Sequence, residues 1–128
     1  MDAPLIHLDT GFAIRALQEG SPEDAEFNRL LALGVRLGIS AVAWSEFVCG
    51  PLDKRHPDMI VKVVGEPVPF LTADAKLAAE FFNLSGRRRG HLNDCMIAAT
   101  AVRVGAALAT TNPNDFRKCP GLRLSYQA

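Results

Sequence analysis

The sequence predicts a single α/β/α domain, in which helices cover both faces of a mostly parallel sheet of about five strands. Short apolar runs of strand length alternate with longer amphipathic segments of helical spacing. The chain has 128 residues, which fits one domain over 1–128, and 48% of them are apolar, enough for a core. Strands that alternate with helices are joined by right-handed crossovers, which make neighbouring strands parallel.

Cap and turn residues set the expected order of the elements. Ser21 and Pro22, followed by two acids, form a typical helix start. Pro67 and Pro69 restrict their segment to an edge-like strand, because proline donates no backbone hydrogen bond. Gly105 ends the helix before it. The expected elements are a strand at 5–8, helices at 11–17 and 22–35, a strand at 38–43, a helix at 53–64, a strand at 67–70, a helix at 73–84 capped by Thr72, a helix beginning near Leu92, a strand at 106–110, a turn or single helical turn at 112–115 and a strand at 122–124.

Charge and cysteine content exclude several classes of protein. Fourteen basic and fourteen acidic residues give a formal net charge of zero, so any site for a polyanion must be local. Cys49, Cys95 and Cys119 show no C-x-x-C spacing, so neither a disulfide framework nor a zinc site is indicated. The N-terminus lacks a basic lead-in, and no apolar run is long enough to span a bilayer. We therefore expect a cytoplasmic protein without membrane contact.

One acid occupies a helix position that is normally apolar. On a helix beginning near Leu92, Asp94 shares a face with Ile97, Ala98 and Ala101. A buried charge needs a partner, because leaving it unpaired costs several kcal/mol. The alternatives are a metal ion, a basic side chain or the free N–H groups of the first helical turn, in which case Asp94 would only cap the helix.

Three further acids follow expected strands, namely Asp9, Glu46 and Asp115. Ligands of parallel sheets bind at the carboxyl ends of the strands, where these acids and Asp94 could converge. Each acid alone could equally be a helix cap. Convergent carboxylates repel one another unless a divalent cation neutralises them, and oxygen ligands suit Mg²⁺ or Mn²⁺. Such ions can stabilise the attacking and leaving oxygens when a phosphodiester is hydrolysed.

At these positions the chain resembles the PIN-domain nucleases, and within them the VapC-type toxins of type II toxin–antitoxin systems. The matching segments run the length of the chain: Leu8-Asp9-Thr10, Ser45-Glu46, residues 90–99 around Asp94, and residues 110–116. The resemblance implies a PIN fold and an endoribonuclease that hydrolyses RNA with Mg²⁺ or Mn²⁺. It also implies a homodimer and inhibition by a VapB-like antitoxin.

Carried over to this chain, the resemblance makes Asp9 and Asp94 the principal metal ligands and Glu46 a third acid. Asp115 would be the fourth, although related proteins can carry that acid at the position of Asn112. Thr10, Ser45 and Thr111 lie beside the acids in the sequence and could orient ligands or water, or could instead cap helices.

The segment Asn112-Pro113-Asn114-Asp115 also fits a purely structural interpretation. Asparagine is a good N-cap, proline suits the first helical position, and an acid at the third completes a capping box. Asp115 would then only close this turn.

A basic run, Arg87-Arg88-Arg89, precedes Asp94 and could hold RNA phosphates, or it could form a solvated loop.

A non-catalytic receiver-like domain would need a lysine at the end of a late strand, where none occurs before Lys118. A third alternative is a module that only binds RNA or a partner, and a test for metal-dependent cleavage would distinguish it from a nuclease.

For the homodimer, we expect six apolar residues on short helices to exceed what one sheet can cover: Val35, Leu37, Phe47, Val48, Ile60 and Val63.

Overall fold

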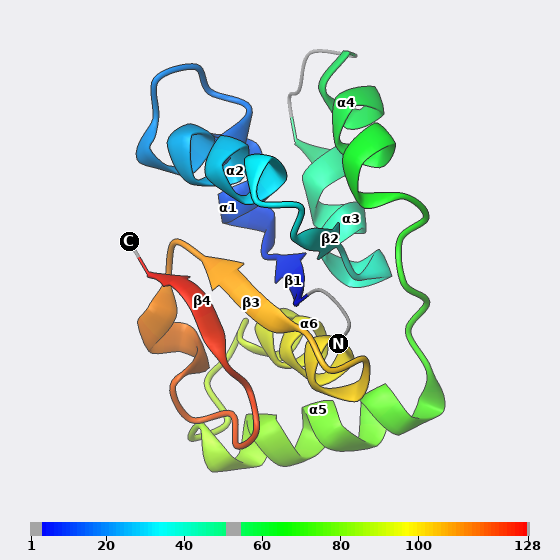
Figure 1. Cartoon of the computed structure of the whole chain (residues 1–128). Helices are drawn as coiled ribbons and strands as arrows, with labels where there is room; N and C mark the ends of the chain where they lie inside the picture. The colour runs from blue at the N-terminus through cyan, green and yellow to red at the C-terminus, as the bar shows by residue number, and fades with distance from the viewer. Residues whose placement is uncertain (1–3, 51–54, 128) are drawn as a thin grey trace.

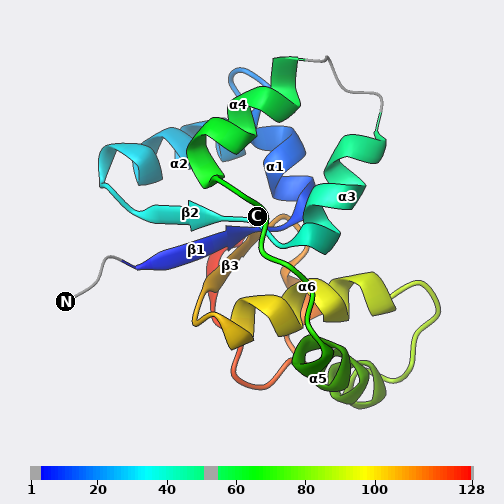
Figure 2. The same cartoon turned by 90° about the vertical axis from the view of Figure 1, so that its right-hand side faces the viewer.

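The structure is a computed structural model that describes residues 4–50 and 55–127. Its elements are, in chain order, β1 Leu5–Leu8, α1 Thr10–Ala16, α2 Pro22–Ala32, β2 Arg36–Gly38, α3 Ala41–Cys49, α4 Arg55–Val64, α5 Thr72–Leu84, α6 Leu92–Arg103, β3 Ala107–Thr110, the 3₁₀ helix η1 Pro113–Phe116 and β4 Leu124–Gln127. The strands form one parallel sheet in the order β2-β1-β3-β4. Helices α1 to α4 lie on one face and α5 and α6 on the other, which confirms the predicted α/β/α architecture (Figure 1, Figure 2).

The second strand lies earlier in the chain than the sequence predicted. The strand expected at 38–43 is wrong, because β2 ends at Gly38 and the Ser40 hydroxyl accepts a hydrogen bond from the Ala43 N–H at 3.1 Å, which begins α3. A short apolar run does not by itself distinguish a strand from a buried helix, and Ser40 was the overlooked N-cap. Glu46 therefore lies in the second turn of α3 and does not directly follow a strand.

The edge strand expected at 67–70 is reduced to one parallel bridge between Ser40 and Val68. Val68 donates to the Ile39 carbonyl at 2.9 Å, and its own carbonyl accepts from the Ala41 N–H at 2.8 Å. Pro67 and Pro69 on either side have no N–H to extend this pairing. The sheet therefore has four strands with one isolated bridge beside β2.

Smaller differences concern the ends of elements. Helix α2 stops at Ala32, because Gly34 takes a left-handed conformation with φ 73° and turns the chain into β2. Thr72 is the first residue of α5 and not its cap, since the Asp74 carboxylate accepts from the Leu71 N–H at 3.0 Å. Strand β4 begins at Leu124, where a strand at 122–124 was expected. Asp53, the expected start of α4, lies outside the described residues.

Apolar side chains fill both faces of the sheet. One cluster packs between the sheet and α1 to α4 and includes Phe12 and Phe47, and the other packs beneath α5 and α6 and includes Leu108. Three alanines of α6 are fully buried, which lets this helix lie close to the strands: Ala98, Ala99 and Ala101. None of the helices in the described part of the chain is long and apolar enough to cross a bilayer.

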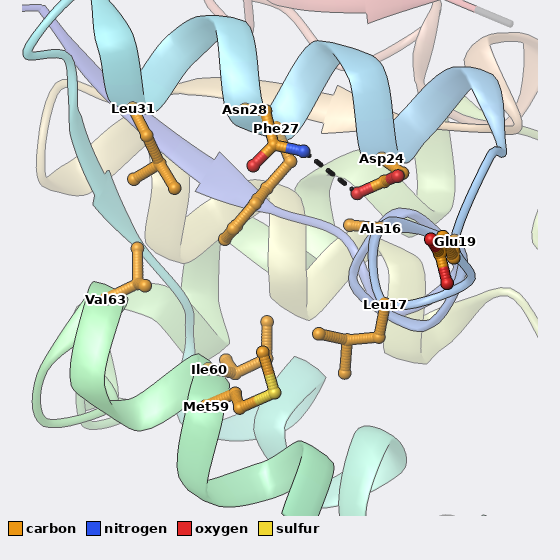
Figure 3. Close-up of a pocket in the computed structure, with 10 residues that line it drawn as sticks. All are labelled: Ala16, Leu17, Glu19, Asp24, Phe27, Asn28, Leu31, Met59, Ile60 and Val63. Carbon is orange, nitrogen blue, oxygen red and sulfur yellow. Dashed lines mark hydrogen bonds between the residues drawn. The ribbon is translucent and has the colours of Figure 1, made fainter.

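A cavity of about 250 Å³ opens between α1, α2 and α4, well away from the four predicted site acids. In Figure 3, Leu17 and Phe27 point into it from α1 and α2, and Met59 faces them from α4. Leu31 and Met59 on its rim are 41% and 54% exposed. Most of its lining is apolar, although Glu19, Asp24 and Asn28 also line it.

Candidate metal centre

The carboxyl ends of β1 and β3 lie side by side and bring the first acid to the middle of the sheet edge. Leu8 of β1 pairs with Ala109 of β3, and the Asp9 N–H continues the ladder by donating to the Ala109 carbonyl at 2.9 Å. Asp9 is also the N-cap of α1, with its carboxylate accepting from the Thr10 N–H at 2.9 Å. The capping interpretation is therefore correct for Asp9 but uses only one of its two oxygens.

The second oxygen of Asp9 accepts from the Thr110 hydroxyl at 2.8 Å, in a site where Asp9 is 5% exposed. Burial raises the pKa of Asp9 to about 6, and the nearby charges of Asp94 and Glu46 act in the same direction. The hydrogen bonds from Thr110 and Thr10 oppose this rise without cancelling it. Asp9 thus carries a charge at neutral pH only at a cost in stability.

Glu46 reaches the same edge from α3. Its Oε1 accepts from the Thr10 hydroxyl at 3.0 Å, and its Oε2 accepts from the Asn93 side-chain amide at 3.3 Å. The carboxylate is therefore held between the first turn of α1 and the first turn of α6. This places Thr10, which the sequence suggested as an orienting hydroxyl, between two of the predicted acids.

Asp94 lies in the first turn of α6 and is half-buried, with 29% of its side chain exposed. The N-cap position belongs to His91, whose Nδ1 lies 3.2 Å from the Asp94 Oδ2. Burial raises the pKa of Asp94; His91 opposes this, while the charges of Asp115 and Glu46 add to it. The three acids therefore repel one another electrostatically.

Asp115 projects from η1 toward the same place. One ligand atom from each of His91, Asp94 and Asp115 lies within 4.8 Å of the other two, the spacing that a bound cation requires. The guanidinium of Arg88 stands among them, with Nη2 2.8 Å from the Asp115 Oδ1 and 3.0 Å from the His91 Nδ1.

Two buried acids elsewhere show what a purely structural carboxylate looks like in this protein. Asp74 accepts from the Arg103 Nε at 2.5 Å, and Glu23 accepts from the Arg15 Nε at 2.6 Å and from the Tyr126 hydroxyl at 2.6 Å. Burial acts to raise the pKa of each, but these partners hold both pKa values below the usual range. Asp9 and Asp94 differ because their pKa values are raised.

The structure does not support the capping interpretation of η1. The Asn112 side chain makes no cap hydrogen bond, and its amide lies 3.4 Å from the Thr111 hydroxyl. The Asp115 carboxylate is paired with Arg88, so the expected capping box is absent from this turn. The Asp115 carboxylate lies with the His91 and Asp94 cluster, whereas the Asn112 amide contacts Thr111.

The remaining predicted residues are dispersed. Ser45 is exposed in the middle of α3, so it does not cap that helix. Of the basic run, Arg88 turns onto Asp115, Arg87 donates to the Asn83 side chain at 2.8 Å, and Arg89 is exposed. The run is thus partly a solvated loop and partly a component of the acidic cluster.

Three residues of this edge were not selected as site residues from the sequence. Thr110, and not its neighbour Thr111, binds Asp9; Asn93 binds Glu46; and His91 contacts Asp94. Alternation along β3 was the available signal for Thr110, since successive strand residues point to opposite faces.

The donors at this edge fit a hard divalent cation. Asp94 and Asp115 offer oxygens within 4.8 Å of each other and of His91, whereas Asp9 and Glu46 fall outside that group and act on Asp94 or on each other through their charges. Two of these acids have raised pKa values, and in the described part of this edge Arg88 is the cation that contacts Asp115. An ion such as Mg²⁺ or Mn²⁺ takes oxygen ligands and would relieve the repulsion.

Comparison with solved structures shows the fold. The chain is similar to VapBC2 from Rickettsia felis bound to a promoter DNA fragment, with 21% identity, a TM-score of 0.75, and coverage of 95% of this chain and 98% of that one. It is also similar to VapBC-1 from nontypeable Haemophilus influenzae, with 23% identity, a TM-score of 0.73, and coverage of 95% of this chain and 97% of that one. The third is DNA-bound VapBC from Salmonella typhimurium, with 22% identity, a TM-score of 0.72, and coverage of 96% of this chain and 98% of that one.

A comparison with curated proteins gave no match. The family model described as PIN domain matches residues 6–122, which include all four predicted acids and every element from β1 to η1, with β4 just beyond the match. This match excludes the receiver-like alternative. The chain belongs to the PIN domain family.

Proposed function

We propose that this protein is a divalent-metal-dependent endoribonuclease and the toxin of a toxin–antitoxin pair. The observation that carries the proposal is that Asp94 and Asp115 offer oxygens within 4.8 Å of each other and of His91, while the charges of Asp9 and Glu46 act on the same edge and the pKa values of Asp9 and Asp94 are raised. Membership of the PIN domain family supports the same chemistry.

Asp9 and Asp94 would hold Mg²⁺ or Mn²⁺ as principal ligands, with Glu46 and Asp115 binding directly or through water. When bound, the ion supplies an activated water and neutralises charge that develops on the phosphodiester. Thr110 and the Thr10 N–H fix the two oxygens of Asp9, while Asn93 and the Thr10 hydroxyl fix those of Glu46. Such supporting contacts orient ligands and tune the site.

RNA would bind through local charge, because the chain as a whole is neutral. Arg87, Arg88 and Arg89 lie on the loop that leads into α6, beside Asp94 and Asp115. Phosphate contacts from such side chains position a nucleic acid without reading its sequence. We therefore expect cleavage to depend on whether the RNA backbone can reach the four acids, and not on the RNA sequence.

The partners proposed are a VapB-like antitoxin and a second copy of this chain. Support comes from the three similar structures, which are VapBC proteins, two of them bound to DNA. The apolar rim of the cavity between α1, α2 and α4 offers exposed surface for a protein contact (Figure 3). A reducing cytoplasm would suit the three free cysteines.

The test is cleavage of a generic labelled RNA by the purified protein with Mn²⁺ or with EDTA. Asp94→Asn keeps the shape of the side chain and removes its charge, so we expect cleavage to fall at least about 100-fold, the upper range for a group that supports a metal. Asp58→Asn removes an equal charge from an exposed position on α4 and should cleave like the wild type. Cleavage that survives both EDTA and Asp94→Asn would refute the proposal.

A further inference from the structure

The guanidinium of Arg88 occupies the place in the acidic cluster that a cation would take. A single nitrogen, Nη2, lies 2.8 Å from the Asp115 Oδ1 on η1 and 3.0 Å from the His91 Nδ1 before α6. The same Nδ1 lies 3.2 Å from the Asp94 Oδ2. Arg88 therefore stands beside acceptors from two separate elements and close to a third.

These contacts cannot all be good hydrogen bonds at once. A ring nitrogen either carries a proton and donates or offers a lone pair and accepts. Toward Asp94 the His91 Nδ1 would have to donate, and toward Arg88, which has only donors, it would have to accept. Water can reach whichever of Arg88 and Asp94 is left over, since their side chains are 60% and 29% exposed, but it cannot reach the contested Nδ1 of His91, which is 3% exposed. A cation removes the conflict, since the Nδ1 lone pair and both carboxylates can all face it.

The Arg88 side chain can move away from Asp115 and His91 without a change in the backbone around it. The Arg88 side chain is 60% exposed, whereas those of Asp115 and His91 are 31% and 2% exposed. The surrounding main chain is fixed: the Arg87 N–H donates to the Phe82 carbonyl at 3.0 Å and the His91 N–H donates to the Arg88 carbonyl at 3.1 Å. The guanidinium is open to water on one side and carries a single charge, so a doubly charged ion attracts the two acids more strongly and can displace it.

We propose that Arg88 is a tethered counter-cation of the metal centre: its guanidinium and a divalent ion compete for one site formed by the His91 Nδ1, Asp94 and Asp115. This rests on the proposed function, because it takes Asp94 and Asp115 as groups that face a metal. It adds that the chain itself carries the competitor, and that His91 presents a nitrogen to the same site. Metal binding then releases the Arg88 side chain from Asp115, so that it can contact an RNA phosphate at the carboxyl edge of the sheet.

The experiment measures Mn²⁺ binding to chelator-treated protein without RNA, by the electron paramagnetic resonance signal of free Mn²⁺. We expect Arg88→Gln to bind Mn²⁺ about tenfold more tightly than the wild type, because the competitor is gone. Arg89→Gln is the matched control, since it removes the same charge from the same loop at an exposed position and should change affinity less than about twofold.

A melting curve gives a second readout. Without metal, Arg88→Gln should melt at a lower temperature than Arg89→Gln, since the acids lose their internal cation, and saturating Mn²⁺ should abolish that difference. Equal Mn²⁺ affinity in the two variants would overturn the inference. Weaker binding by Arg88→Gln would also overturn it, because Arg88 would then be holding Asp115 in position for the metal.

These outcomes separate the inference from the proposed function. If the wild type binds Mn²⁺ and cleaves RNA but Arg88→Gln binds no more tightly, only the competition fails. If none of the three proteins binds Mn²⁺, the metal-dependent function and the inference fail together.

Discussion

Asp9 shows at the scale of one residue how a site differs from a structural contact. Its two oxygens are bound by neutral donors, Thr10 and Thr110, while its charged neighbours are other acids. Asp74, equally buried, is instead bound by Arg103. The negative charge of such a carboxylate lowers the stability of the folded protein, and a bound cation would remove this loss.

The first prediction is that Asp9→Asn stabilises the metal-free protein at pH 7, by about 1–3 kcal/mol. The folded pKa is about 6, above the ordinary 3.8, so the folded state binds more protons between these values and the cost is fully present above about pH 6. The gain should therefore shrink as pH falls from 6 to about 4. Urea unfolding of both proteins in EDTA at several pH values measures it.

The comparison needs both proteins because His7 titrates in the opposite sense. Burial lowers the pKa of His7 to about 4, with Arg103 acting in the same direction, so this group favours the folded state as pH rises from about 4 to 6.5. That contribution is common to the wild type and the variant and cancels in the difference. A variant that is less stable at pH 7, or a gain that does not depend on pH, would contradict this account of Asp9.

At the scale of elements, the short helix η1 decides the role of the fourth acid. Its first residue is Pro113, and the Asp115 N–H donates to the Asn112 carbonyl at 3.1 Å, so the turn forms without a side-chain cap. The Asp115 carboxylate is thereby left to face Arg88 and the cluster around Asp94.

We predict that Asp115→Asn lowers Mn²⁺ affinity and RNA cleavage at least about tenfold, the typical scale for a supporting ligand. Asn112→Ala should change cleavage less than about twofold, because the Asn112 side chain is exposed and makes no cap hydrogen bond. Both variants would be compared by melting temperature and by Mn²⁺-dependent cleavage. If Asp115→Asn shows a thermal defect alone, Asp115 is not part of the metal centre.

Local patterns predicted some elements and failed on others for physical reasons. Helix α6 with its inward acid was predictable, because an acid among small apolar residues at helical spacing is uncommon. The α3 start was not, since Ile39 to Ala43 is apolar whether it forms a strand or a helix, and the tertiary fold decides. Glu46 was nevertheless identified as a site acid, although the strand expected to end before it does not exist.

The contacts among the candidate site residues could not be predicted from local sequence. The hydrogen bond from Thr110 to Asp9 joins residues 101 positions apart, and that from Asn93 to Glu46 joins residues 47 apart. Such pairs depend on sheet order and helix placement. Only the four acids carried a signal strong enough to be noticed beforehand.

For the whole molecule, the apolar surface differs from the one expected. Leu37, Phe47 and Ile60 are buried in the core, and of the six residues proposed to remain uncovered only Val48 is exposed, at 45%. Other large apolar residues are exposed instead: Leu31, Leu33, Met59, Val61, Leu71, Leu84 and Leu92. The argument for association therefore rests on a different set of residues.

We predict a homodimer, because the exposed apolar residues Leu31 and Met59 at the cavity between α1, α2 and α4 would lose contact with water on association. Light scattering coupled to size exclusion should give twice the chain mass of 13.8 kDa at micromolar protein. A mass of one chain over that range would contradict the prediction. A small protein that copurifies at a fixed ratio would instead support the antitoxin proposal.

The acids at the sheet edge are proposed to hold an ion that activates water for RNA hydrolysis, and the chemical ends of the cleavage products distinguish this reaction from attack within the RNA. Attack by water leaves linear phosphate and hydroxyl ends, whereas attack by the neighbouring 2′-hydroxyl leaves a 2′,3′-cyclic phosphate. We predict linear ends only, formed with Mn²⁺, absent with EDTA and absent with Asp9→Asn or Asp94→Asn. Cyclic phosphate ends, or linear ends formed equally by these variants, would contradict the account.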